Sequence, residues 1–171
     1  NQWNEWNTEG LRLNSGANIN LSAELPSQWW VFAGYNLNAL GESYDDRTAR
    51  GGPAVRRVMR RNAWLGFETD ARKPVSFVAQ GFVVARDESG SHFWGVDPEM
   101  NFRISSSVQG SLGVSHSEGV EDMQWYGNVA TPSGTAYTFA RLDQKTTSIT
   151  ARVDYTLTST LSFQLYAQPF I

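Results

Sequence analysis

Arginine side chains form the densest charged group of the chain, between residues 47 and 61. The four that lie closest together are Arg56, Arg57, Arg60 and Arg61. A guanidinium group donates paired hydrogen bonds that match the oxygens of a phosphate or a carboxylate. We therefore predict that these four residues bind anionic lipid or an anionic solute. The alternative is a solvated cluster in which they form ion pairs with nearby carboxylates such as Asp45 and Asp46.

The secondary structure of residues 54–61 stays open. In a strand, successive side chains point to opposite sides, so Arg57 and Arg61 would face lipid while Arg56 and Arg60 would face a polar interior. The apolar residues of the segment also recur at helical spacing after Pro53, which would give a short basic helix.

No group of residues has the spacing of a catalytic or metal site. His92 and His116 lie near predicted loops, and a Ser-His-Asp hydrolase needs a serine and an acid to converge on such a histidine. Serines are too common here for proximity in sequence to identify one. Acidic loop residues could offer oxygens to calcium, but residues 87–90 do not continue as an EF-hand loop. We predict a protein that is not an enzyme and has no metal site or cofactor.

Aromatic residues are frequent, with seven tryptophans in the chain. Trp29 follows a predicted tight turn, and Trp94 lies near a loop on the apolar side of its strand. In a membrane barrel these are the heights of the two interfacial aromatic girdles. We predict interfacial positions for Trp29 and Trp94; the alternative is ordinary core packing.

The elements that must position these residues are long strands in which apolar and polar residues alternate. In the last hairpin, Ile149, Val153 and Leu165 share one face, and Thr150 and Arg152 share the other. Such a period of two places one face in an apolar medium and the other in a polar one. Eight strands are predicted, over residues 10–25, 28–40, 62–69, 75–86, 92–104, 108–116, 137–157 and 161–171. Most exceed the roughly 5–6 residues usual in globular proteins.

The connections between these strands alternate in size. Residues 26–27, 70–74, 105–107 and 158–160 form short turns, whereas residues 41–53, 87–91 and 117–136 form larger or more charged loops. Residues 1–9 show no period and are also predicted to be a loop. All short turns then fall at one end of the sheet, which is the pattern of an outer-membrane barrel.

Composition excludes some classes of protein and favours others. A chain of 171 residues fits a single domain, and the absence of cysteine excludes disulfides and thiolate metal sites. A net charge of −3 argues against a nucleic-acid partner. Only Lys73 and Lys145 are lysines among the 14 basic residues. Soluble β-proteins commonly protect their surfaces with lysine, whereas the lumen of a closed membrane barrel does not need it.

Three segments carry a resemblance to a known family: DDRTARGGPAVRR at 45–57, YTFARLDQ at 137–144 and LSFQLYAQPF at 161–170. Residues 45–171 resemble an uncharacterised family of bacterial β-barrels that follow a carbohydrate-binding family-9-like module. The resemblance implies an outer-membrane location and a barrel with more strands than eight, but no activity. The chain lacks the preceding module and stops at Ile171, where relatives would continue, so we expect a fragment of a larger protein.

Together these observations predict an all-β fold: an antiparallel up-and-down transmembrane β-barrel, or a segment of a larger one, over residues 1–171. The predicted location is the bacterial outer membrane, with a structural, anchoring or pore and transport role. The expected partners are outer-membrane lipid and lipopolysaccharide, other envelope proteins or the missing part of the same chain, and no nucleic acid. The alternative is a soluble, lipocalin-like eight-stranded barrel that binds a small apolar ligand.

Overall fold

The computed structural model describes residues 1–171 and consists of β-strands joined by turns and loops, without a helix. The strands are β1 (Gln2–Trp6), β2 (Arg12–Glu24), β3 (Trp30–Asn38), β4 (Ser43–Asp45), β5 (Val55–Arg57), β6 (Arg60–Glu68), β7 (Val75–Arg86), β8 (His92–Arg103), β9 (Val108–Thr131), β10 (Gly134–Thr158) and β11 (Leu161–Ala167). The chain contains no helix with the length and hydropathy needed to cross a membrane.

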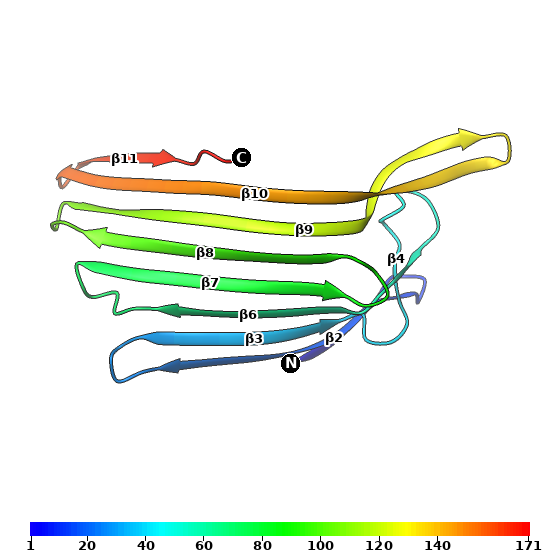
Figure 1. Cartoon of the computed structure of the whole chain (residues 1–171), viewed down its shortest axis with the longest axis horizontal. Helices are drawn as coiled ribbons and strands as arrows, with labels where there is room; N and C mark the ends of the chain where they lie inside the picture. Colours follow the sequence, from blue (N-terminus) through cyan, green and yellow to red (C-terminus); the bar gives the residue numbers. More distant parts are fainter.

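Nine strands form one antiparallel sheet in the order β1-β2-β3-β6-β7-β8-β9-β10-β11, while β4 and β5 pair only with each other. Neighbours in the sheet are neighbours along the chain, apart from the inserted β4 and β5, so the topology is up-and-down (Figure 1). This confirms the predicted all-β antiparallel fold. The predicted closure into a barrel is not present, because β1 and β11 are the two edges of an open sheet.

Two predictions about local structure are wrong. Residues 1–9 contain a strand, β1, which pairs with Arg12–Ala17 of β2 and raises the sheet from the expected eight strands to nine. Residues 117–136 are mostly strand, because β9 and β10 continue as a hairpin beyond the rest of the sheet. Neither segment has a face that meets a single medium, apolar or polar, along its whole length. Neither therefore shows an alternation of apolar and polar residues. Residues 54–61, for which the sequence left strand and helix open, contain β5 and the start of β6 and no helix.

One face of the sheet is apolar from β2 to β11. Directly paired residues of antiparallel strands share a face, and the pairing of Phe77 with Met100, Met100 with Leu112 and Leu112 with Ala151 shows how the apolar rows line up. Between the turns and the level of Arg61, Glu118 and Lys145, this face carries no charged residue. No other layer covers it, and Ile19, Leu65 and Leu165 are 60, 67 and 67% exposed.

The opposite face carries polar residues together with aromatic rings that lie over glycines. Trp64 pairs with Gly34, Phe82 with Gly95 and Phe93 with Gly119. A Cβ atom at Gly34 would lie only 2.0 Å from the Trp64 ring, so the ring occupies the space of the missing side chain. Such cross-strand aromatic–glycine pairs cover the backbone of the glycine and favour curvature of the sheet.

The polar face is the concave side of the sheet. Three hollows, with volumes of about 200, 560 and 730 Å³, are lined mainly by residues of this face and of the adjoining loops. Large side chains here, such as Trp64 and Phe82, are half-buried, whereas Leu65 on the opposite face projects into the surroundings. Side chains converge on the inside of a curved sheet and diverge on the outside.

The loop between β3 and β6, residues 39–59, crosses the end of the sheet and contains β4 and β5. We call it the crossing loop. The Arg50 guanidinium carbon lies 4.1 Å from the centre of the Trp125 ring, and Asn128 Nδ2 donates a hydrogen bond of 3.1 Å to the Arg50 carbonyl. The crossing loop thus joins β3 and β6 to the projecting β9–β10 hairpin (Figure 1). Ala49 in this loop is 2% exposed.

Candidate functional site

The four arginines predicted to bind anions do not form one cluster. Three of them are paired with acids: Arg56 Nη1 lies 2.9 Å from Glu88 Oε2, Arg57 Nη2 lies 2.8 Å from Asp45 Oδ2, and Arg61 Nη2 lies 2.8 Å from Asp87 Oδ2. Arg60 forms no ion pair. The solvated, ion-paired alternative therefore describes Arg56, Arg57 and Arg61, and Arg60 differs from them.

The strand β6 places Arg60 and Arg61 on opposite faces. Arg61 pairs with Leu37 and Ala85 and so lies at the loop end of the apolar face. Arg60 pairs with Asn38 of β3 and Arg86 of β7 and so lies on the polar face. This is the orientation predicted for a strand. Arg56 and Arg57 belong to β5, which is separate from the main sheet, so its two sides are not the apolar and polar faces of that sheet.

A second polar group lies beside Arg60 on β7 and β9. Arg86 Nη1 contacts Glu121 Oε1 at 2.5 Å, and the Met123 backbone N–H donates to the same oxygen at 3.1 Å. Ser91, which is 5% exposed, donates to Glu121 Oε1 at 3.4 Å. Its hydroxyl oxygen accepts a hydrogen bond of 3.0 Å from the backbone N–H of Asp122. These contacts hold the Arg86 guanidinium in a fixed place on the polar face.

A hollow of about 730 Å³ lies between this end of the polar face and the crossing loop. Its lining includes Asn38, Arg60 and Arg86 from the sheet and Arg56 and Arg57 from the loop. A volume of this size is within the range of about 300–1,000 Å³ that small-molecule sites occupy. The arrangement brings guanidinium groups from three strands to one water-accessible space.

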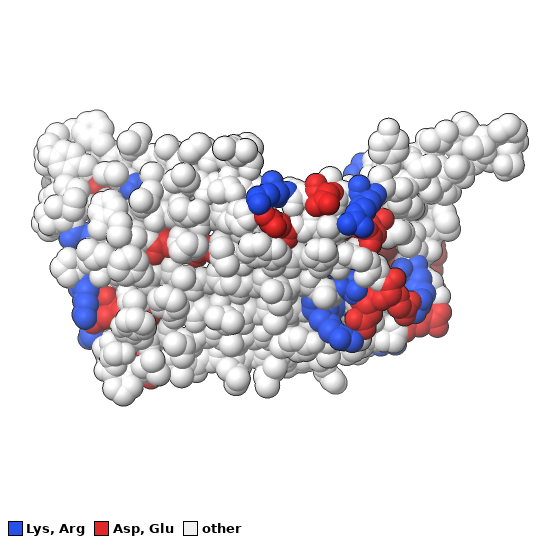
Figure 2. All heavy atoms as spheres, in the orientation of Figure 1, with Lys and Arg blue, Asp and Glu red and all other residues white.

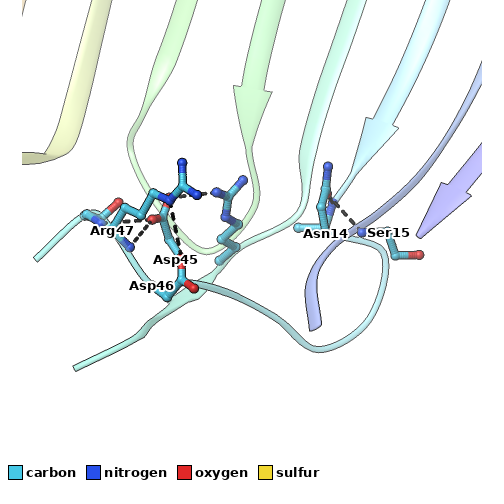
Figure 3. A network of polar contacts seen from close by, with 8 residues as sticks. Asn14, Ser15, Asp45, Asp46 and Arg47 are labelled. Carbon is cyan, nitrogen blue, oxygen red and sulfur yellow. Dashed lines mark hydrogen bonds and ion pairs between the residues drawn. The ribbon is translucent and has the colours of Figure 1, made fainter. Parts of the chain in front are cut away.

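The crossing loop is held by hydrogen bonds that converge on Asp45 (Figure 3). Its Oδ1 accepts from the backbone N–H groups of Arg47 and Thr48, both at 2.9 Å. Burial raises the pKa of the Asp45 carboxyl, but these two donors and the nearby Arg57 guanidinium outweigh it and hold that pKa below its usual value. The carboxylate thus stays charged and fixes the turn at residues 45–48 of the loop.

Asn14 fixes the beginning of the crossing loop, next to β2. Its Oδ1 accepts hydrogen bonds from the backbone N–H groups of Ser15, at 3.0 Å, and of Ala39, at 3.1 Å (Figure 3). Ala39 is 4% exposed and has a positive φ of 55°. The asparagine side chain therefore satisfies a backbone donor where β3 ends and the chain turns into the loop.

The two tryptophans predicted at membrane interfaces lie at opposite ends of the apolar face. Trp29 precedes β3 at the turn end, where its ring stacks on Phe67 with centroids 5.7 Å apart. Trp94 lies on β8 near the loop end, where its ring is 5.4 Å from that of His116. Charged side chains gather mainly toward the two ends of the sheet (Figure 2). The interfacial role of both tryptophans stays a prediction.

The two histidines have different hydrogen-bond partners, and His116 Nε2 also lies 3.3 Å from Glu118 Oε1. His92 Nδ1 contacts the Gly90 carbonyl at 2.8 Å, and His116 Nδ1 contacts the Thr147 hydroxyl at 2.7 Å. Neither forms a hydrogen bond with a serine. No group of three or more His, Cys, Asp or Glu residues has the geometry to hold a metal ion.

The sequence did not identify the neighbours that distinguish Arg60. Asn38 and Arg86 are far from it along the chain and become adjacent only through the register of β3, β6 and β7. The one available signal was alternation, because Asn38, Arg60 and Arg86 all fall on the polar parity of their strands. Alternation identifies a face but not which residues of neighbouring strands are opposite one another.

The fold and the site define a class: an open up-and-down sheet with an apolar convex face and a polar concave face that ends in an arginine-lined hollow. Within that class, the chain belongs to the family described as "Domain of unknown function (DUF5916)", whose model matches residues 2–171. No curated protein and no solved structure matches the chain. The family match does not connect the chain with a carbohydrate-binding module, so the resemblance described above stays a prediction.

Proposed function

We propose that the chain is a wall segment of a bacterial outer-membrane β-barrel, with a structural, anchoring or pore-forming role and no catalytic role. The observation that carries the proposal is the uncovered apolar face, which spans the sheet from β2 to β11 and lies on its convex side. Soluble proteins rarely expose a continuous apolar patch larger than a few hundred Å². The hydrocarbon core of a lipid bilayer would cover such a face and keep it from water.

The height of the apolar face supports this proposal. On β10 it runs from Ile149 to Leu157 without a charged residue on that side, and on β7 from Val75 to Ala85. A tilted strand of about 9–11 residues crosses the hydrocarbon core. At the loop end the apolar rows give way to Arg61, Glu118 and Lys145, which would lie at the level of lipid headgroups. Lipid and lipopolysaccharide are the partners that this face would contact.

The open edges of the sheet indicate what else the wall needs. β11 and the part of β2 beyond Ala17 have no strand partner on their outer sides. Unpaired backbone groups are costly in a bilayer, which is why membrane strands occur in closed barrels. We infer that further strands, from the same protein or from another envelope protein, complete the wall.

A soluble barrel of the lipocalin type would require the opposite arrangement of faces. Its ligand lies inside, so the concave face must be apolar. Here the concave face carries Asp97, Glu99 and Asn62, and the exposed aliphatic residues lie on the convex side. This distribution supports the membrane wall.

Flotation with lipid vesicles tests the proposal. The chain, refolded in the presence of phosphatidylcholine vesicles and applied to the bottom of a density gradient, should rise with the lipid and remain with it after an alkaline carbonate wash. Recovery of folded, monomeric protein in the lipid-free fractions would refute a membrane wall. Circular dichroism of both fractions shows whether the protein in each is folded.

A further inference from the structure

The polar face holds a row of hydrogen-bond donors at the hollow beneath the crossing loop. Asn38 on β3, Arg60 on β6 and Arg86 on β7 are directly paired across neighbouring strands. Neighbouring strands lie about 4.8 Å apart, so adjacent side chains of the row can contact one small ligand. All three residues line the hollow of about 730 Å³.

Two arginines that face each other across a strand pair repel unless an anion lies between them. Arg86 is partly neutralised by Glu121, at 2.5 Å. The other cations that line the hollow also have acids, since Arg56 contacts Glu88 and Arg57 contacts Asp45. The fourth carboxylate of the lining, Asp122, lies 3.6 Å from Arg141, which is outside the hollow. Arg60 is therefore the one arginine of the lining that has no acid of its own.

We propose that Arg60, together with Asn38 and Arg86, binds the carboxylate or phosphate group of a small anionic solute. The Arg60 guanidinium supplies a fork of N–H donors that matches two oxygens of such a group. The Asn38 amide, which lines the same hollow, supplies a further donor from the neighbouring strand. Arg86 supplies positive charge and is held in place by Glu121 and the contacts around Ser91.

The position of Arg60 favours a solute over a lipid headgroup. Arg60 lies on the concave polar face, whereas Arg61, the next residue, lies at the end of the apolar face. A lipid phosphate at the headgroup level would reach Arg61 first. If the hollow lies on the path of a solute through a barrel, that role rests on the proposed function. The binding of an anion in the hollow does not depend on it.

Neighbouring residues on opposite faces give a matched pair of variants, Arg60→Gln and Arg61→Gln. Each removes one positive charge from the same strand. The experiment is isothermal titration of the full chain, folded in a neutral detergent at low ionic strength, with inorganic phosphate and, separately, with succinate. We expect both anions to bind the unaltered chain, Arg60→Gln to weaken binding at least about tenfold, and Arg61→Gln to change it less than about twofold.

Three results would overturn the proposal. The first is no binding of either anion by the unaltered chain. The second is an equal loss in both variants, which would show a diffuse effect of net charge. The third is binding only to vesicles that contain phosphatidic acid and not to free phosphate, which would assign the arginines to lipid. Detergent-based binding requires no insertion into a bilayer, so failure of this test and failure of vesicle flotation are distinguishable.

Discussion

The two faces of the sheet are built from the same strands and yet meet different surroundings. The convex face carries aliphatic and aromatic residues that remain largely exposed, such as Leu65 and Leu165, each 67% exposed. The concave face carries amides, carboxylates and arginines, and its aromatic rings lie flat on glycines of the next strand. A soluble sheet buries its apolar face, so this difference supports the proposal that the apolar side is the outside of a wall in lipid.

The largest expected effect comes from placing a charge on each face in turn. Ile149→Arg, Val153→Arg or Leu165→Arg should destabilise the protein folded in vesicles by about 2–4 kcal/mol, because a guanidinium near the bilayer centre loses hydration. Thr150→Arg lies on the polar face and should cost little. Equilibrium unfolding by urea in the presence of vesicles measures both. Similar losses on the two faces would remove the distinction between them.

A smaller effect is expected from filling the space beneath an aromatic ring of the concave face. In Gly34→Ala the new Cβ would overlap the Trp64 ring, with 2.0 Å between them, and we expect a loss of about 1–3 kcal/mol from overpacking. Gly113→Ala is the control on the same face, because its nearest neighbours would lie 3.5 Å away. Urea unfolding of the two variants should differ. Equal stability would show that the ring moves aside freely and does not shape the sheet.

The alternation of residues explains how much of this structure the sequence could predict. β7 has the bounds predicted for it, Val75–Arg86, because its apolar face is unbroken from Val75 to Ala85. β1 and the outer parts of β9 and β10 lie at an edge or beyond the sheet, where no face is selected for one medium. The sequence therefore predicts loops for these segments.

The candidate site could be predicted only in part, for a related reason. The parity of β6 separates Arg60 from Arg61, and this much is visible in the sequence. The pairing of Arg60 with Arg86 depends on the register across the β6–β7 turn, and the ion pairs of Arg56 and Arg57 depend on how the crossing loop folds. None of these follows from residue type and spacing alone.

The smallest expected effect concerns the crossing loop that borders the polar side. The pKa of Asp45 lies below its usual value of 3.8, so its contribution to stability is complete above that pH and is lost as the pH falls through the lowered pKa. Below about pH 3.8 the amides of Arg47 and Thr48, which donate to Asp45, should lose protection from hydrogen exchange. Asp45→Asn should show no such step. A loss of protection at the same pH in this variant would assign the transition to another group.

Chemical labelling of single cysteines tests the central claim most directly, since the chain has no cysteine of its own. Cysteines placed one at a time at residues 149–157 of β10 would be exposed to a water-soluble maleimide with the protein folded in vesicles. The account predicts alternation: protection at Ile149, Ala151, Val153, Tyr155 and Leu157, and labelling at Thr150, Arg152, Asp154 and Thr156. Uniform labelling along the strand, or protection with the opposite parity, would contradict the assignment of the apolar face to lipid.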